Sequence, residues 1–152
     1  MTRWQLPPLA KVYEALSAVA DGRVQLTGVT SARVISSAGD KTYTVRWSPD
    51  LTQVTADDNA SRWQGYTGYP IIAVLLTLGK LDYDPAVAQA LAGVPWNTLN
   101  AQYKRDYAAA IDHVLRDVAA TGGRPDAIRQ EAERIFARLS ELELSRLTGK
   151  RA

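Results

Sequence analysis

Apolar positions with a helical spacing open the chain. Leu9, Val12, Leu16 and Val19 follow the period of one helix face, and two prolines precede them. Asp21 and Gly22 then interrupt the pattern with residues that favour turns. The spacing predicts a helix from residue 9 to residue 20.

The next pattern has a period of two. In the stretch 41–47, Tyr43, Val45 and Trp47 would lie on one face and the intervening polar side chains on the other, as in a half-buried strand. Gly39-Asp40 and Pro49 provide turn residues on either side of it. Similar short runs rich in strand-forming residues predict an antiparallel meander of three or four strands, which would use residues 23–29, 32–36, 41–47 and 52–56.

The remainder of the pattern is helical. The run from Pro70 to Gly79 is apolar all round, which predicts a central buried helix. Asp84 and Pro85 would begin a second helix. Asn97 would cap a long third helix over 98–120, whose apolar positions follow one face.

The last helix has the clearest pattern. Ile128, Ala132, Ile135, Leu139 and Leu142 are spaced four, three, four and three, which predicts a narrow apolar seam. This seam would pack on the preceding helix or on a second copy of the chain. Phe136, Leu144 and Leu147 lie off the seam, where exposed apolar side chains would require a partner.

Together these elements predict an α+β fold: an N-terminal helix, a small antiparallel sheet and a C-terminal half of about four helices. We expect residues 1–152 to form a single domain. Within it, 1–56 would hold the helix and sheet, 57–69 an aromatic and glycine-rich loop, 70–147 the helical half, and 148–152 a frayed tail.

Composition narrows the chemistry. The 152 residues include no cysteine and one histidine, which removes disulfides and thiol nucleophiles and leaves few ligands for zinc. We therefore expect no metal and no cofactor. The net charge of +2 permits a polyanionic partner without demanding one. No signal peptide and no apolar run of about 20 residues is visible, so we expect a cytoplasmic protein with no membrane partner.

The stretch 57–69 is the candidate binding surface. Trp63, Tyr66 and Tyr69 are three residues apart among glycines, and aromatic rings displayed in this way can stack on bases or fill a partner's pocket. In the alternative interpretation, the rings cover the sheet and Asp58 or Asn59 caps a short helical turn. The candidate binding residues are Asp57, Asp58, Asn59, Arg62, Trp63, Gln64, Tyr66 and Tyr69.

One resemblance concerns the same region. Residues 39–80, "GDKTYTVRW…TQVTADDNASRWQGYTGYPIIAVLLTLGKL", resemble the ββα pattern of the SWIM zinc-binding family, in which a Cys-x-Cys hairpin and a Cys-x-His loop precede an apolar helix. Thr55 and Asp57 stand in place of the first pair, and Pro70 leads directly into Ile71 in place of the second. All zinc ligands are missing, so the resemblance implies nucleic-acid or protein binding without zinc.

Three functional hypotheses follow. The first is a non-catalytic interaction module that binds a nucleic acid or a protein partner through residues 57–69. The second is a structural homo-oligomer formed through residues 125–147. The third is an enzyme in which Asp57 and Asp58 help to hold a divalent metal ion.

Overall fold

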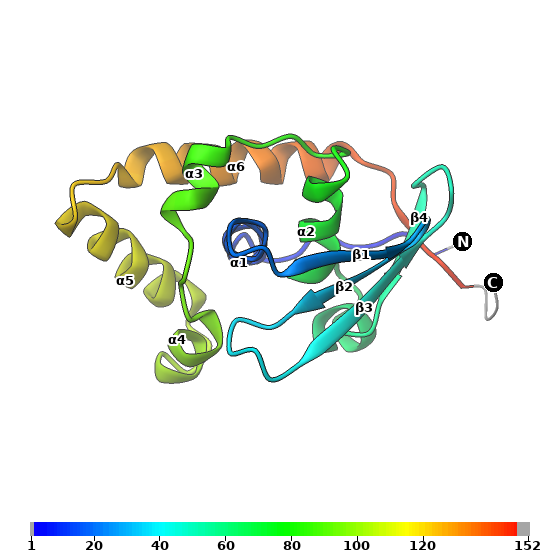
Figure 1. The fold of residues 1–152 in the computed structure, drawn as a ribbon, viewed down its shortest axis with the longest axis horizontal. Helices are drawn as coiled ribbons and strands as arrows, with labels where there is room; N and C mark the ends of the chain where they lie inside the picture. Colours follow the sequence, from blue (N-terminus) through cyan, green and yellow to red (C-terminus); the bar gives the residue numbers. More distant parts are fainter. Residues whose placement is uncertain (1, 149–152) are drawn as a thin grey trace.

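The computed structural model describes residues 2–148 and has an α+β fold (Figure 1). An N-terminal helix is followed by a sheet and then by a helical half. In chain order the elements are α1 Ala10–Ala20, β1 Val24–Gly28, β2 Ser31–Ile35, β3 Thr42–Trp47, β4 Gln53–Ala56, the π-helical turn η1 Ala60–Gln64, α2 Tyr69–Thr77, α3 Pro85–Ala90, α4 Trp96–Gln102, α5 Tyr107–Ala120, α6 Pro125–Glu141 and β5 Ser145–Arg146.

The sheet has five strands in the order β1-β2-β3-β4-β5. The first four form the antiparallel meander predicted from the sequence. The fifth strand is an addition: β5 pairs in parallel with β4, with Gln53 opposite Ser145 and Val54 opposite Arg146. A strand of two residues has no recognisable alternation, which is why the sequence pattern did not indicate it.

The two ends of the described chain meet at this edge of the sheet (Figure 1). The Trp4 backbone N–H donates to the Leu144 carbonyl at 3.0 Å, and the Arg146 N–H donates to the Thr2 carbonyl at 2.7 Å. The Arg146 guanidinium lies over the Trp4 ring, 4.3 Å from its centroid. Thr148 is exposed, and residues 149–152 of the predicted tail lie outside the described residues.

The core lies between the sheet and the helices. Val45 and Trp47 of β3 are buried and Thr44 and Arg46 are exposed, as the alternation predicted. The helix α2 is buried from Pro70 to Leu76 and contacts α1 on one side and β1 to β4 on the other. This position between the two layers explains why it carries apolar residues on every face.

The predicted helix over 98–120 is wrong, because α4 and α5 are separate. Lys104 and Arg105 adopt positive φ angles of 53° and 66°, which cannot continue a right-handed helix. The carboxylate of Asp106 then accepts a hydrogen bond from the Ala109 N–H at 3.1 Å and begins α5 anew. Pro95, and not Asn97, precedes the first turn of α4. The described C-terminal half therefore has five α-helices where about four were expected.

The seam of α6 is buried within the chain itself. Ile128, Ala132, Ile135 and Leu139 are buried, and α6 contacts α1, α3 and α5. Off the seam, Phe136 and Leu147 are half-buried and Leu144 is buried, so these residues form no exposed patch. Among the described residues, the hypothesis of a homo-oligomer through 125–147 therefore has no exposed apolar seam to support it.

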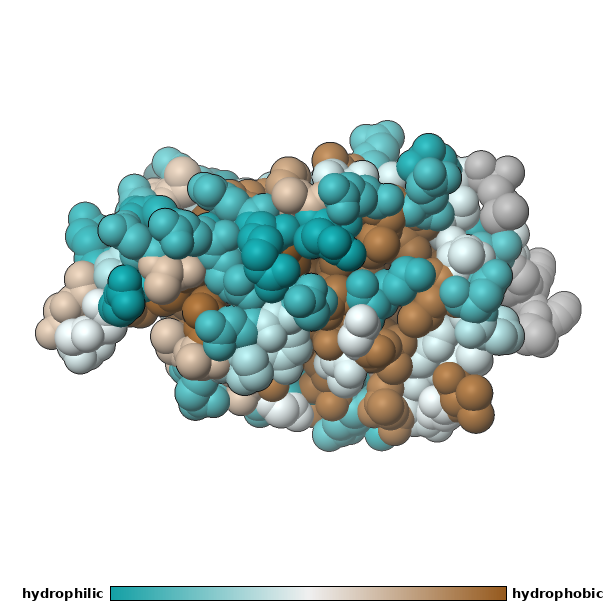
Figure 2. All heavy atoms as spheres, turned by 90° about the horizontal axis from the view of Figure 1, so that it is seen from above, coloured by the Kyte–Doolittle hydropathy of each residue, from teal (hydrophilic) through white to brown (hydrophobic). Residues whose placement is uncertain are grey.

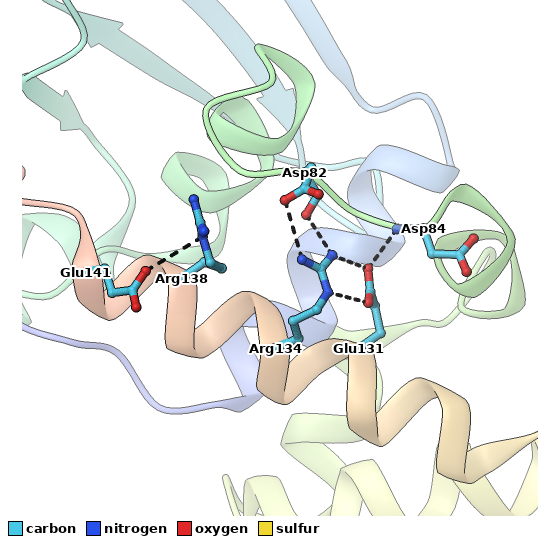
Figure 3. A network of polar contacts seen from close by, with 6 residues as sticks. All are labelled: Asp82, Asp84, Glu131, Arg134, Arg138 and Glu141. Carbon is cyan, nitrogen blue, oxygen red and sulfur yellow. Dashed lines mark hydrogen bonds and ion pairs between the residues drawn. The ribbon is translucent and has the colours of Figure 1, made fainter.

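A polar network ties α6 to the start of α3 (Figure 3). Both Glu131 carboxylate oxygens accept hydrogen bonds from the Arg134 guanidinium, at 2.8 and 2.9 Å. Arg134 also donates to the Asp82 carbonyl at 3.1 Å. The Asp84 backbone N–H donates to Glu131 at 2.7 Å, while the Asp84 carboxylate caps α3 through the Ala86 N–H. The Arg134 hydrogen bonds lower the pKa of Glu131, so the network is ionised at neutral pH.

The face above α6 is mixed in character (Figure 2). Polar side chains dominate it over the helical half, and apolar side chains show between them nearer the sheet. None of the helices formed by the described residues has the length and apolar character that a membrane span requires.

Candidate functional site

Residues 57–69, predicted to be an aromatic and glycine-rich loop, form a compact turn. The chain makes the π-helical turn η1 at Ala60–Gln64 and then pairs Tyr66 with Gln5 in an isolated bridge. The Asp58 carboxylate accepts a hydrogen bond from the Ser61 N–H at 3.1 Å and so caps this turn, whereas the Asn59 side chain makes no capping bond. The alternative interpretation predicted that Asp58 or Asn59 caps a short helical turn, and this is confirmed for Asp58.

Gly68 closes the turn against the following helix. Its N–H donates to the Ser61 hydroxyl at 3.1 Å, and its φ of −74° is open to any residue. A Cβ at this position would collide with an Asp58 carboxylate oxygen. Glycine is therefore required here by close approach, which lets Asp58 lie beneath the turn.

A cleft of about 600 Å³ opens between η1, α1, α4 and the start of α5. This volume is within the range of binding sites for small ligands or single residues of a larger partner. Aromatic side chains form much of its wall and come from four different elements and the segments that join them. They are Tyr43, Trp63, Tyr66, Tyr69 and Tyr107.

The rings differ in how far they are exposed. Trp63 is 71% exposed at the rim, while Tyr66 and Tyr69 are half-buried. Tyr43 and Tyr69 meet edge to face, with centroids 6.3 Å apart and an interplanar angle of 87°. Burial raises the pKa of both tyrosines, so their hydroxyls stay protonated at neutral pH and can donate hydrogen bonds.

Cationic side chains outnumber acidic ones in the lining of the cleft. Three cationic side chains, Lys11, Lys41 and Arg105, face two acidic ones, Glu14 and Asp58. Among residues 2–148 neither Lys41 nor Arg105 forms an ion pair, and both are exposed. The cleft therefore presents two free cations at its rim.

The acidic side chains lie deeper. Glu14 is 4% exposed, and one of its oxygens receives the Lys11 ammonium at 3.5 Å and the Asn100 amide at 3.3 Å. Burial raises the pKa of Glu14 despite these partners. Burial is the largest single influence on Lys11 and would lower its pKa, but the Glu14 carboxylate, Tyr107 and Tyr66 together outweigh burial and raise that pKa, so Lys11 is charged at neutral pH.

Asp58 is 5% exposed, and burial raises its pKa as well. One of its oxygens accepts from Ser61, but the other, Oδ1, is buried without a hydrogen-bond partner in the described structure. The Oδ1 atom of Asn100 is also buried without a hydrogen-bond partner in the described structure. Buried polar atoms almost always have partners, so these two acceptors, which have almost no accessible surface, are unusual.

Six of the eight candidate residues line this cleft: Asp58, Asn59, Trp63, Gln64, Tyr66 and Tyr69. Asp57 does not, and its carboxylate instead accepts a hydrogen bond from the Thr44 N–H of β3 at 2.8 Å. Arg62 is exposed beside the rim, with its guanidinium 5.8 Å from the centre of the Trp63 ring.

Asp57 and Asp58 thus point to different sides. Within the part of the chain that the structure describes, no three histidine, cysteine or carboxylate side chains are grouped as they would be around a metal ion. The hypothesis of a divalent-metal enzyme has no donor set there.

The sequence interpretation missed the far wall of the cleft, above all Lys11, Glu14 and Asn100. One signal was present in α1, "AKVYEALSAVA": Lys11, Glu14 and Ser17 are its three strongly polar residues and are three apart. They form a polar stripe along a helix that is otherwise apolar and buried. Charged residues are almost never buried without a partner, so such a stripe indicates a polar site inside the fold.

Comparison with known proteins adds one finding. A family model described as Uncharacterised conserved protein UCP014422 matches residues 4–145. No curated protein and no solved structure matches the chain. The family match indicates no SWIM domain, so the resemblance over residues 39–80 is unconfirmed.

Proposed function

We propose, for this chain that belongs to the family Uncharacterised conserved protein UCP014422, that its cleft binds a short segment of single-stranded nucleic acid. The observation that carries the proposal is the meeting of aromatic rings and unpaired cations around one polar cleft. Single-strand binding surfaces combine these two features, because bases stack on rings and phosphates are attracted to cations.

The aromatic part is provided mainly by Trp63. Its side chain is 71% exposed, although indole rings usually bury most of their surface. Stacking a base on such a ring contributes about 1 to 3 kcal/mol. The half-buried rings of Tyr66 and Tyr107 line the same cleft and would offer further apolar surface beneath the base.

The cationic part comes from segments that are far apart in the chain. Lys41 lies just before β3, and Arg105 lies between α4 and α5. Arg62 stands beside Trp63 on η1. A phosphate backbone would run past these three exposed side chains, while the acidic groups are buried.

The acidic floor suits a base better than a phosphate. Glu14 is already paired with Lys11, and Asp58 is covered by the η1 turn. Phosphates would therefore meet the cationic rim, and a base would enter between the rings. This division is typical of sites that hold the backbone outside and read or stack the base within.

Fluorescence anisotropy with a labelled oligothymidylate tests the proposal. Binding should weaken as salt rises, with a slope of about −0.7 in log K against log salt for each phosphate contacted. Trp63→Ala should weaken binding by roughly fivefold or more, and, because the ring is exposed, it should leave the free energy of unfolding within about 0.5 kcal/mol.

Charge variants add a matched comparison. Lys41→Gln should weaken binding and reduce the magnitude of the salt slope by about 0.7. Lys80→Gln removes another exposed lysine, which does not line the cleft, and it should change neither quantity. Absence of binding at low salt, or equal effects of the two lysine variants, would overturn the proposal.

A further inference from the structure

The two edges of the sheet differ. At one edge, the N-terminal segment of the same chain lies beside β5: Arg3 forms a bridge with Ser145, and the Arg146 N–H donates to the Thr2 carbonyl. At the other edge, β1 has no further strand beside it within residues 2–148. Four of its five residues, Gln25 to Gly28, are exposed. The chain itself therefore closes one edge of the sheet and leaves the other open.

The pairing of β1 with β2 determines which backbone groups face the open edge. The Ile35 N–H donates to the Arg23 carbonyl at 3.0 Å, so this carbonyl points toward β2. Successive residues of an antiparallel strand turn their N–H and C=O groups to opposite sides. Val24 and Leu26 therefore direct these groups away from β2, to a side where no described strand receives them.

A row of apolar side chains reaches the same edge. Leu26 is opposite Ala32, and Ala32 is opposite Val45 on the next strand. Ala32 and Val45 are fully buried in the core, but Leu26 is 57% exposed. Val29, in the turn between β1 and β2, is 94% exposed. The row thus ends in open apolar surface, which a further strand would cover.

The open edge carries no charge of its own. Proteins commonly protect an edge strand with charged side chains or proline, because both disfavour pairing with another strand. Residues 24–30 include neither. Arg23 precedes them, but its guanidinium is engaged by the Asp21 carboxylate at 3.2 Å and by the Ile35 carbonyl at 2.7 Å. An uncharged edge offers a charged peptide no complementary group, whereas two copies of it can meet without opposing like charges.

We infer that β1 pairs with β1 of a second copy of this chain, antiparallel and about a two-fold axis, so that the two sheets join. In the register that uses the outward groups of both copies, Val24 is opposite Leu26 of the second copy, and about four main-chain hydrogen bonds form. The two Leu26 side chains then continue the apolar row across the interface. The bulge between Leu26 and Gly28 lies at the end of this pairing and leaves it regular. This interface goes beyond the proposed function and does not rest on it.

Engineered cysteines test the register, because the chain has no cysteine of its own. At the two-fold axis the Gln25 residues of the two copies would be directly opposite, with their Cβ atoms about 4.5 to 5.5 Å apart. Gln25→Cys should therefore give a disulfide-linked dimer under a mild oxidant. Arg33→Cys is the matched control, since Arg33 is exposed and is opposite Gln25 on β2. Its two copies would be about 14 Å apart, too far for a disulfide.

Sedimentation equilibrium of the full chain measures the association itself. The average mass should rise from 16.6 kDa toward twice that value as the protein concentration increases. Leu26→Lys should raise the dissociation constant at least about tenfold, because it removes apolar contact and places a charge on the edge strand. Leu6→Lys is the matched control: Leu6 is 50% exposed but belongs to the N-terminal segment, and its replacement should leave the constant unchanged.

The results decide for or against this interface. A mass of one chain at every concentration, or equal disulfide formation by the two cysteine variants, would overturn the inference. An oligomer that Leu26→Lys leaves intact would also contradict it, because a different surface would then join the copies. Should Leu26→Lys fail to fold, the cysteine variants decide, since Gln25 and Arg33 are both exposed and polar. Neither experiment contains nucleic acid, so the outcome is independent of binding in the cleft.

Discussion

A buried hydroxyl connects α1 to α4, and both helices contribute residues to the cleft. Ser17 of α1 is fully buried, accepts a hydrogen bond from the Trp96 indole N–H at 2.8 Å and donates to the Leu91 carbonyl at 2.7 Å. Trp96 begins α4 and is itself 2% exposed. Ser17→Ala would remove both bonds and leave a buried donor and a buried acceptor without partners.

The expected loss follows from these two groups. A buried polar group left without a partner costs about 1 to 3 kcal/mol. Alanine has a higher helix propensity than serine, and this difference offsets about 0.5 kcal/mol of the loss. Since neither Trp96 nor Leu91 is open to water, both groups lose their partners, and we expect Ser17→Ala to lower the free energy of unfolding by about 1.5 to 5.5 kcal/mol.

Urea denaturation followed by circular dichroism measures this loss. Ser140→Ala is the matched control, because Ser140 is also helical and donates to a backbone carbonyl, that of Ala137, at 2.6 Å, but is exposed. It should change stability by no more than about 0.5 kcal/mol. If Ser17→Ala lies within that range at an unchanged m-value, the hydrogen-bonded connection between α1 and α4 contributes nothing and the reasoning is refuted.

Other predictions concern the η1 turn and the buried carboxyl. Gly68→Ala should destabilise the protein by about 1 to 3 kcal/mol through overpacking against Asp58. Gly28→Ala, whose Cβ would meet only the hydroxyl of the half-buried Ser31, should cost less in the same urea titration. Equal losses would contradict a steric requirement for glycine at position 68. Burial raises the pKa of Glu14 above 4.5, so protonation favours folding, and the stability of wild type relative to Glu14→Gln should rise as pH falls from 7 toward 4.5. Glu131, whose pKa is lowered by Arg134, should show the opposite sign: wild type loses its advantage over Glu131→Gln as pH falls below 4.5. Parallel pH profiles for the two variants would contradict these assignments.

Much of the fold could be predicted because its elements carry strong local patterns. The alternation around Val45 and the all-apolar run of α2 each have one physical solution, a half-buried strand and a buried helix. The break between α4 and α5 has no such signal, since Lys104 and Arg105 adopt the left-handed region without a glycine. The short β5 depends on a pairing between residues some 90 positions apart, which no local pattern encodes.

The candidate site also has one part that the sequence indicates and another that it does not. Trp63 and its neighbours stand out locally, because aromatic and polar residues among glycines are unusual immediately before a buried helix. The opposite wall depends on tertiary structure, which brings Glu14 and Asn100 together from 86 positions apart. Only the polar stripe on α1, with Lys11, Glu14 and Ser17 three residues apart, could have indicated this wall in advance.

Amide chemical shifts of the isotope-labelled protein, followed while an oligothymidylate is added, test the central claim most directly. At 16.6 kDa the chain is suited to this measurement. If the cleft binds single-stranded nucleic acid, shifts should gather on η1, on the α4 residues near Asn100 and on Arg105, and should saturate with the oligonucleotide. Saturable shifts confined to β1 and β2 or to α6, or no shifts at low salt, would contradict the account.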